Sequence, residues 1–191
     1  KNIRTGLGLF KKIRSLYSYL NLIVFHLRKI FLGFEYANIH IENIDKNSLK
    51  LILRKYGAQI GTNCDIETGL TFHNCRDYSN LIIGDNCHIG KNCFFDLSNN
   101  ILIGDNVVIS MRNTIITHID LGESDLSKYY STLSKSVTIQ NDCYIGVGST
   151  ILMGVEIGKS VFIGAGSMVT KSVIPNTMIV GIPAKKIKEL V

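Results

Sequence analysis

The sequence predicts a mainly β protein whose chain winds into triangular coils behind a helical N-terminal region. Three observations predict this fold. Apolar residues recur every six positions from residue 60 to residue 169, glycine often follows them directly, and apolar residues between 9 and 34 follow helical spacing instead. An amphipathic helix repeats every 3.6 residues and a half-buried strand every two, so neither explains a period of six. A short strand and a turn do, with one side chain pointing inward on each pass.

The repeat is long and regular. Fifteen positions open a hexad, all are apolar, and twelve are isoleucine. They are Ile60, Ile66, Phe72, Ile83, Ile89, Phe95, Ile103, Ile109, Ile115, Ile139, Ile145, Ile151, Ile157, Ile163 and Val169. Because three passes close one coil, fifteen hexads predict about five coils. Stacked coils align these side chains into ladders and expose sheet edges only at the two ends of the stack.

The repeat stops once, between Ile115 and Ile139. The 24 residues that separate these positions are a whole multiple of six, and the intervening sequence, HIDLGESDLSKYYSTLSKS, is polar. We therefore expect a loop extruded at about residues 118–136, after which the ladder resumes in phase.

The two ends of the chain differ from the repeat. Residues 1–56 form a basic, apolar helical region, in which the stretch 47–57 should cover the first coil, since a solenoid needs capped ends. Residues 57–174 form the coils. After Pro175 we expect an extended segment and a short basic helix over residues 175–191.

The positive charge gathers in the N-terminal region. Residues 1–56 hold eleven Lys and Arg against three acidic residues, while the whole chain has a net charge of +6. The uncharged stretch from residue 15 to residue 27 is too short for an ordinary transmembrane helix. Two interpretations of residues 1–34 stay open: a helix packed on the solenoid or on a neighbouring subunit, and an interfacial helix on an anionic membrane.

The cysteines indicate a reducing compartment. They number five, contain no CxxC pair, and no signal peptide precedes them, so we expect free thiols in a cytoplasmic protein. Four of them occupy one fixed position of the repeat, which favours a packing role over zinc binding. We expect no metal, and no feature points to nucleic acid as a partner.

Two histidines are candidate bases. His118 stands where the repeat stops, with Asp120 two residues later, and His73 follows a repeat phenylalanine in TFHNC. We expect His118 to act and hold His73 in reserve. The remaining three histidines lie in an apolar helix, in ANIHIEN without a partner, and outside the coil core.

From about residue 57 to residue 188 the chain resembles the hexapeptide-repeat acyltransferases. The similarity is carried by the fifteen hexads and by the closing sequence YIGVGSTILMGVEIGKSVFIGAGSMVTKSVIPNTMIVGIPAKK. It implies a left-handed parallel β-helix, acetyl-CoA as co-substrate, and a homotrimer with active sites between subunits. It also implies that His118 is the catalytic base, as in the saccharide O-acetyltransferases of the family.

The chemistry explains why one imidazole suffices. Acetyl-CoA is already an activated thioester, so the reaction needs a base that takes the proton of the attacking hydroxyl. Such a base needs a group that holds its other ring nitrogen, and Asp96, in CFFDLSNN, is the candidate. Asp120 would orient the base or bind the acceptor. A turn role is open for both aspartates.

The resemblance also places the donor. By matching positions, the Val147 N–H would face the developing oxyanion, and the remaining residues would line the path of coenzyme A. These are Gly146, Gly148, Ala165, Gly166, Thr170, Lys171, Pro183, Lys185 and Lys186. Relatives often have Trp where this chain has Tyr144, which we expect at the acceptor pocket.

The sequence thus predicts an acetyl-CoA-dependent O-acetyltransferase acting on a sugar hydroxyl in surface polysaccharide (capsule, O-antigen or exopolysaccharide) biosynthesis. We expect it in the cytoplasm, with peripheral contact at the inner face of the membrane as an alternative. Other interpretations stay open: a small non-saccharide acceptor such as an antibiotic or serine, a metal-binding carbonic-anhydrase-like protein, and a non-catalytic scaffold. The histidine that the metal-binding class needs shortly after His118 is absent, since Gly122 and Glu123 stand there.

Overall fold

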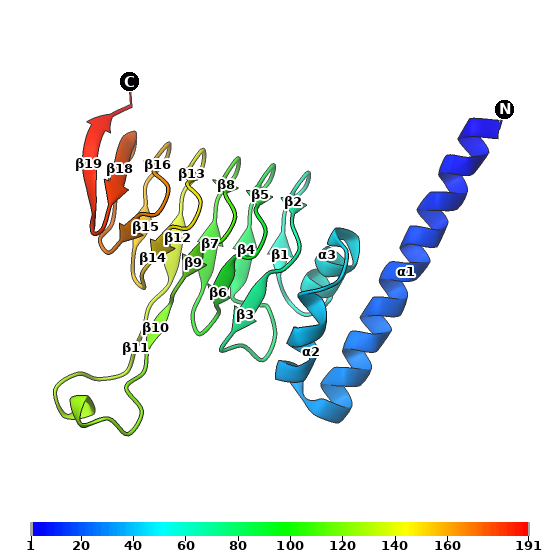
Figure 1. The fold of residues 1–191 in the computed structure, drawn as a ribbon, viewed down its shortest axis with the longest axis horizontal. Helices are drawn as coiled ribbons and strands as arrows, with labels where there is room; N and C mark the ends of the chain where they lie inside the picture. Colours follow the sequence, from blue (N-terminus) through cyan, green and yellow to red (C-terminus); the bar gives the residue numbers. More distant parts are fainter. Residues whose placement is uncertain (1, 191) are drawn as a thin grey trace.

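The computed structural model describes the backbone of residues 2–190 and the side chains of residues 12–190. It shows a solenoid of short strands with helices at its N-terminal end (Figure 1). The predicted helical segment begins at residue 9, and the side chains of its first three residues are not among those described: Leu9, Phe10 and Lys11.

Three sheets form the sides of the solenoid, and the chain visits them in a fixed order. Sheet A contains β1 (Gln59–Ile60), β4 (Leu81–Ile83), β7 (Ile101–Ile103), β12 (Val137–Ile139) and β15 (Glu156–Ile157). Sheet B contains β2 (Asp65–Ile66), β5 (His88–Ile89), β8 (Val108–Ile109), β13 (Tyr144–Ile145), β16 (Phe162–Ile163), β18 (Thr177–Gly181) and β19 (Ala184–Glu189). Sheet C contains β3 (Thr71–His73), β6 (Phe94–Asp96), β9 (Thr114–Ile115), β14 (Thr150–Ile151) and β17 (Met168–Val169).

The predicted ladders are confirmed. In sheet B, Ile66 pairs in register with Ile89, which pairs with Ile109, and the repeat positions of the other two sheets align in the same way. Their side chains point into the solenoid, where they are almost all fully buried. One branched or aromatic side chain from each short strand therefore builds the core, as the period of six requires.

The solenoid has about six turns rather than about five. Beyond the fifteen hexads, Val173 bridges Ile157 of sheet A and Ile179 of β18 pairs with Ile163 of sheet B. The hexad count missed this partial turn because Val173 follows Val169 by only four residues, so the period of six breaks there.

The corner between sheets A and B has a left-handed backbone in each turn. Asn63, Asn86, Asn106 and Asp142 occupy it with φ between 54° and 61°, a region that Asn and Asp tolerate better than most residues. Their side chains also join one coil to the next, since the amide of Asn63 donates to Asn86 at 3.0 Å and that of Asn86 to Asn106 at 3.2 Å. The corner residues thus tie the coils together along one edge.

The predicted C-terminal helix is wrong. Residues Ala184–Glu189 form β19, which pairs antiparallel with β18 after a reversal at Gly181 (φ 108°). A helix of this length is marginal by itself, whereas β18 offers β19 hydrogen-bond partners along one side. The basic residues of this segment therefore lie on a hairpin at the end of the solenoid.

Three helices precede the coils: α1 (Asn2–Leu32), α2 (Phe34–Ile41) and α3 (Lys46–Lys55). Gly33 joins the first two with φ 89°, and the Asp45 carboxylate caps α3 by accepting from the N–H groups of Asn47 and Ser48. The buried face of α3 includes Leu49, Ile52 and Leu53, which join the core that continues into the first coil.

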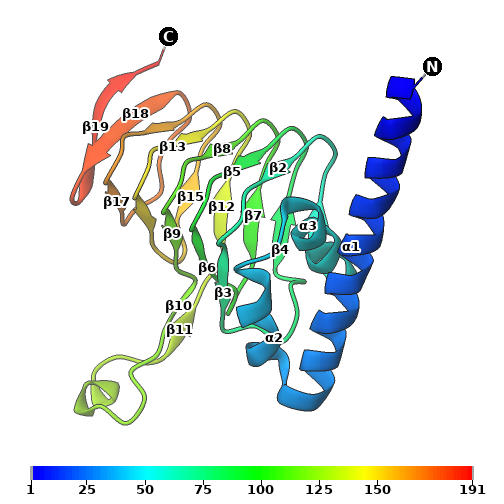
Figure 2. The ribbon, with the colours of Figure 1, turned by 45° about the vertical axis from the view of Figure 1, so that its right-hand side comes forward.

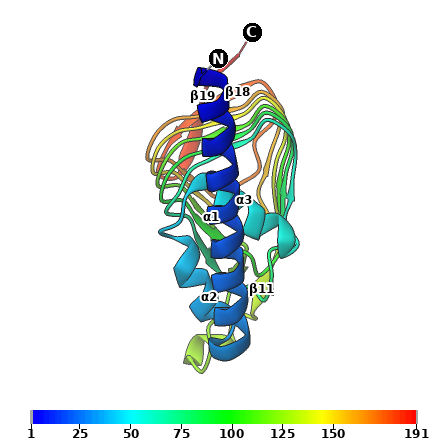
Figure 3. The same ribbon diagram turned by 90° about the vertical axis from the view of Figure 1, so that its right-hand side faces the viewer.

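The longest helix, α1, crosses the N-terminal end of the molecule and contacts α2 and α3 (Figures 2 and 3). It packs inward through Ser18, Asn21 and Phe25, not through the apolar positions that its helical spacing marks. Among residues 2–190, no helix combines the length and the hydropathy that crossing a membrane requires.

Candidate active site

His118 lies at the root of a projecting loop. After β9 the chain leaves the coil, and β10 (His118–Ile119) pairs antiparallel with β11 (Leu133–Ser134), so that His118 faces Ser134 across the pair. The loop between them, which carries the 3₁₀ helix η1 (Asp125–Lys128), extends away from the solenoid (Figures 1 and 2). The chain rejoins the coil at β12, where Ile139 pairs with Ile103.

The imidazole of His118 is held by Asp96. Its Nδ1 lies 2.5 Å from the Asp96 carboxylate, which comes from the end of β6 one coil earlier, and the ring is 27% exposed. Because an ionised carboxylate only accepts hydrogen bonds, Nδ1 carries the proton and donates it. The lone pair of Nε2 is therefore left for a substrate.

Asp96 is a buried carboxylate with many donors. Its side chain is 1% exposed and also accepts from the backbone N–H groups of Thr117 (2.8 Å) and His118 (3.0 Å). Burial by itself would raise the pKa of Asp96, but the hydrogen bonds from His118, Thr117 and Asn74 outweigh it and hold the pKa below its ordinary value. Asp96 therefore stays ionised beside the base.

Asn74 lies against the face of the same imidazole. Its amide nitrogen is 3.3 Å from Nδ1 and 3.1 Å from Nε2 of His118, and it donates to Asp96 at 3.1 Å. Since Cε1 lies between the two ring nitrogens, an atom in the ring plane at these distances would overlap it. The Asn74 amide must therefore lie above the ring, which leaves the in-plane approach to Nε2 open.

These groups open into a hollow of about 420 Å³ with a polar lining. Its residues are Asn74, Cys75, Arg76, Ser98, His118, Asp120, Thr132 and Ser134. Asp120 lines it but also holds a turn, since it accepts from the Gly122 N–H at 2.9 Å and from Thr132 at 3.2 Å. The Gly122 hydrogen bond lowers the pKa of Asp120, which keeps a negative charge at the rim.

Sequence reasoning missed Asn74, Cys75, Arg76 and Ser98. A signal for two of them exists, because Cys75 and Ser98, like His118, each follow a ladder residue of sheet C by three positions. They therefore stack at the same corner in three successive coils. His73, the reserve candidate, pairs in register with Asp96, but its ring lies 5.9 Å from that of Phe94 and does not line the hollow.

The residues predicted for the acetyl donor lie on other parts of the solenoid. Gly146, Val147 and Gly148 form the corner between sheets B and C, and Ala165 and Gly166 form the same corner one coil later. A Cβ on Gly148 or Gly166 would meet nothing within 4 Å, so space lies beside both. Among the described residues, none accepts a hydrogen bond from the Val147 N–H.

The other predicted donor residues are also exposed. Thr170 and Lys171 follow β17 at the corner between sheets C and A, on the edge that carries His118. Pro183, Lys185 and Lys186 lie on the C-terminal hairpin, where Lys186 pairs with Glu189 at 2.5 Å.

Tyr144, the predicted acceptor contact, stacks on Phe162 at 4.8 Å on sheet B. Of the residues found to line the His118 hollow, none belongs to the predicted donor set and none is Tyr144. One chain thus gathers His118, Asp96 and Asp120 but leaves the donor residues apart.

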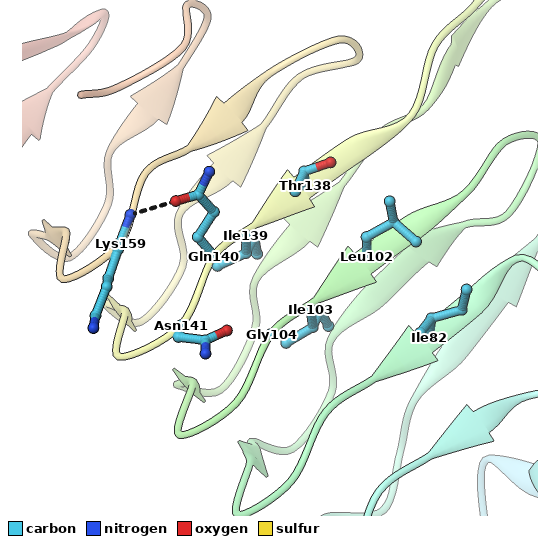
Figure 4. Close-up of a pocket in the computed structure, with 9 residues that line it drawn as sticks. All are labelled: Ile82, Leu102, Ile103, Gly104, Thr138, Ile139, Gln140, Asn141 and Lys159. Atoms are coloured by element: carbon cyan, nitrogen blue, oxygen red, sulfur yellow. Dashed lines mark hydrogen bonds between the residues drawn. The ribbon is translucent and has the colours of Figure 1, made fainter. Parts of the chain in front are cut away.

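A second hollow, of about 440 Å³, lies on the outer side of sheet A (Figure 4). Ile82, Leu102 and Thr138 project from successive strands there, and Gln140 accepts from the Lys159 N–H at 3.0 Å. The described lining offers no histidine or carboxylate as a base, so it does not compete with His118 as a reaction centre. Across the part of the chain that the structure describes, no group of three or more His, Cys, Asp or Glu side chains converges as a metal site.

The sequence is similar to families and proteins of known activity. A family profile described as "Bacterial transferase hexapeptide (six repeats)" matches residues 136–171, and one described as "Hexapeptide repeat of succinyl-transferase" matches residues 80–117. The chain is 31% identical to the galactoside O-acetyltransferase of Escherichia coli (strain K12) over 170 residues, which cover 86% of this chain and 78% of the relative.

Solved structures share the fold over most of both chains. A maltose O-acetyltransferase from Clostridium difficile 630 is 28% identical with a TM-score of 0.68, and the alignment covers 92% of this chain and 85% of that one. A galactoside acetyltransferase in complex with coenzyme A is 28% identical with a TM-score of 0.70, and the coverage is 89% and 82%.

Proposed function

Because this chain belongs to the hexapeptide-repeat acetyltransferases, we propose that it transfers the acetyl group of acetyl-CoA to a hydroxyl of a saccharide. The fold is the left-handed β-helix of these acyltransferases, and acetyl-CoA is the co-substrate. The saccharide acceptor is supported by the relatives named galactoside and maltose O-acetyltransferase. The observation that carries the proposal is the His118–Asp96 pair at the edge of a polar hollow.

His118 would act as the general base. Its Nε2 takes the proton of the acceptor hydroxyl while the oxygen attacks the thioester carbonyl, which gives a tetrahedral intermediate. The C–S bond then breaks, the acetyl ester forms, and the thiolate of coenzyme A takes the proton back from Nε2. Asp96 stabilises the imidazolium between these steps and is not itself protonated, and general acid–base catalysis of this kind contributes about 10²–10⁴-fold.

The backbone of Val147 would stabilise the oxyanion. Its N–H is directed to no acceptor among the described residues, and one oriented N–H at the developing charge contributes about 10²-fold or more to the rate. Gly146, Gly148, Ala165 and Gly166 would then flank the pantetheine arm, with Thr170 and Lys171 farther along. Pro183, Lys185 and Lys186 would meet the nucleotide, where lysine can pair with a phosphate.

A complete site would need two subunits. His118 lies at the corner between sheets C and A, whereas Val147 lies at the corner between sheets B and C. Because these corners are the two ends of one side of the triangle, a single chain keeps them apart. In a threefold assembly, one corner of a subunit would face the other corner of its neighbour, so we propose a homotrimer with three shared sites. Tyr144 would then reach the acceptor from the neighbouring subunit.

The hollow suits a hydroxyl-rich acceptor. Asn, Ser, Thr and Asp side chains line it, and Arg76 adds a positive charge that an acidic saccharide would use. We therefore propose a role in surface polysaccharide biosynthesis. A cytoplasmic location fits the five free thiols, four of which donate to backbone carbonyls of the next coil.

The test measures acetyl-CoA-dependent thiol release with a panel of neutral and acidic saccharides and small alcohols. His118→Ala should lower turnover at least about 100-fold while the affinity for acetyl-CoA stays within about twofold. The matched control is His88→Ala, because His88 is a half-exposed histidine beside Asp65 on sheet B. Turnover that survives His118→Ala would move the base elsewhere, and turnover with small alcohols alone would contradict the saccharide acceptor.

A further inference from the structure

The outward side of α1 is apolar along its described length. The spacing of three and four residues that marks one helical face runs from residue 13 to residue 31, about 27 Å of helix. All of its large apolar side chains are well exposed: Ile13, Leu16, Leu20, Ile23, Val24, Leu27, Ile30 and Phe31, with exposed fractions between 39% and 77%. An exposed apolar face of this extent marks an interaction surface.

Contacts on the opposite side fix the rotation of the helix. Phe25 is buried between Phe34 and Tyr56, with ring centroids 5.8 Å and 4.7 Å away. The amide of Asn21 donates to the Ser48 hydroxyl at 3.0 Å, and both side chains are buried. Ser18, Asn21 and Phe25 therefore point into the molecule, and turning the apolar face inward would break these contacts.

The charges around this face select its partner. Helix α1 carries six Lys and Arg and no acidic residue. Lys12 and Arg28 are exposed near the two ends of the apolar face, whereas Arg14 lies on the inward side, beside Asn47 and Leu51 of α3. Two copies of α1 packed face to face would bring these like charges together, which is unfavourable, whereas an anionic surface would neutralise them.

We propose that the outer face of α1 binds the surface of an anionic lipid bilayer. The apolar side chains enter the boundary between headgroups and acyl chains to a depth of about 5–10 Å, and the flanking cations pair with lipid phosphates. Tyr17 and Tyr19, two positions apart, lie on opposite edges of this face and are 52% and 53% exposed. Tyrosine with an apolar ring and a polar tip is enriched at this depth.

The position of α1 connects this surface with the active site. The hollow draws Asn74, Ser98 and His118 from the first three coils, which are the ones nearest the N-terminal end that α1 crosses (Figure 1). Two coil steps add about 10 Å, and the two layers of helix, α1 and the helices α2 and α3 beneath it, add about 10 Å each. A bilayer on α1 would thus lie about 30 Å from the hollow, and an acceptor held at the membrane would have to extend over that distance.

The experiment is co-sedimentation of the full-length protein with vesicles of phosphatidylcholine alone and of phosphatidylcholine mixed with phosphatidylglycerol. Wild type should partition at least about tenfold more strongly to the anionic vesicles, and Leu20→Glu should lower that partitioning at least about tenfold. Ile174→Glu is the matched control, because Ile174 is an exposed isoleucine (62%) outside α1, and it should leave partitioning unchanged. Raising the salt from 0.1 M to 1 M shortens the Debye length from about 10 Å to about 3 Å and should weaken binding.

Three outcomes would overturn the proposal: no sedimentation of wild type with either vesicle, equal sedimentation of wild type and Leu20→Glu, and an assembly larger than a trimer that Leu20→Glu disperses. The last result would assign the face to a second copy of this chain. Circular dichroism and thiol release of Leu20→Glu should match wild type, since the side chain is half exposed. Co-sedimentation measures membrane binding without any enzymatic turnover. Its result is therefore independent of whether the proposed acetyl transfer is correct.

Discussion

At the scale of single residues, the position of one proton depends on a buried carboxylate. Asp96 accepts from a ring nitrogen and two backbone N–H groups, so the neutral imidazole of His118 carries its proton on Nδ1 and keeps the lone pair on Nε2. Asn74 covers one face of the ring from a left-handed backbone position (φ 53°), which is a site that Asn tolerates. Neither group needs to touch the substrate to affect the rate.

Asp96→Asn should reduce kcat about 10- to 100-fold with a smaller change in KM. The new amide can donate to Nδ1, which would place the ring proton on Nε2 and remove the base. Kinetics with a saccharide acceptor at pH 7 measure the separate changes in kcat and KM. Asp105→Asn is the control, because Asp105 is a half-buried aspartate at a corner between sheets A and B, away from His118. A kcat equal to that of wild type would contradict the assignment of Asp96 as the group that holds His118.

The same substitution should have a pH-dependent effect on stability. Because the pKa of Asp96 is lowered in the folded protein, its carboxylate stabilises the fold above the unfolded pKa of about 3.9, and this stabilisation is lost as the pH falls through the folded pKa. Asp96→Asn should cost roughly 1–3 kcal/mol at pH 7 and less at pH 3. Urea unfolding at one subunit concentration measures the loss of stability at each pH. A loss at pH 3 as large as that at pH 7 would contradict the predicted pH dependence.

Asn74→Gly should lower kcat about tenfold while KM stays within about twofold. Glycine accepts the positive φ without strain and removes the amide that lies over the ring and donates to Asp96, so the loss reports the positioning of the His118–Asp96 pair. Asn63→Gly, at a left-handed corner on the far side of the coil, is the matched control and should leave kcat unchanged. Equal kinetics for the two variants would show that the Asn74 amide has no positioning role.

At the scale of elements, each strand is only two to six residues long and has no stability of its own. Its side chain in the ladder and its hydrogen bonds to both neighbouring coils hold it in place, so stability is shared along the stack. The left-handed corners between sheets A and B add side-chain hydrogen bonds from coil to coil.

Ile109→Ala should lower the free energy of unfolding by about 2–5 kcal/mol per chain. Ile109 is 0% exposed in the middle of its ladder, so the substitution leaves a cavity between Ile89 and Ile145. Ile119→Ala is the control, because Ile119 is 40% exposed in the projecting loop and should change stability by under about 1 kcal/mol. Urea unfolding compares them, and similar losses would contradict the ladder as the source of stability.

At the scale of the whole molecule, the proposed site is divided between edges of the triangular solenoid. His118 and the donor corner of Val147, Gly148, Ala165 and Gly166 cannot meet within one chain. The apolar outer face of α1 lies at the end of the stack, so a threefold assembly with parallel axes would present three such faces in the same direction.

Mixed trimers should recover activity from two inactive variants. His118→Ala lacks the base, and Ala165→Trp blocks the exposed donor corner, so each alone should be inactive. In a shared site, an equal mixture reassembled from separated subunits should regain about one quarter of wild-type turnover, because a quarter of the interfaces combine the two intact halves. Mixing without reassembly is the control, and no recovery after reassembly would contradict a site shared between subunits.

The period of six determined the ladders, the fold and the break at His118, because each inward side chain must repeat once per strand wherever coils stack. The break itself marked His118 as the proposed base, and Asp96 was predicted as its partner from the end of the preceding coil. Residues of the hollow that were not predicted include Asn74, Arg76 and Ser98. They come together only because coils stack, and the residue types at their corner differ from coil to coil, so no pattern of residue types marks them.

The last turn and the ends of the molecule were decided by tertiary structure. Residues 184–189 have the composition of a short basic helix, yet pairing with β18 makes them a strand. The apolar spacing of α1 was readable, but spacing alone does not say which way a face points. Phe25 and Asn21 decided that, because their contacts with Phe34, Tyr56 and Ser48 hold their side of α1 inward and leave the apolar face exposed.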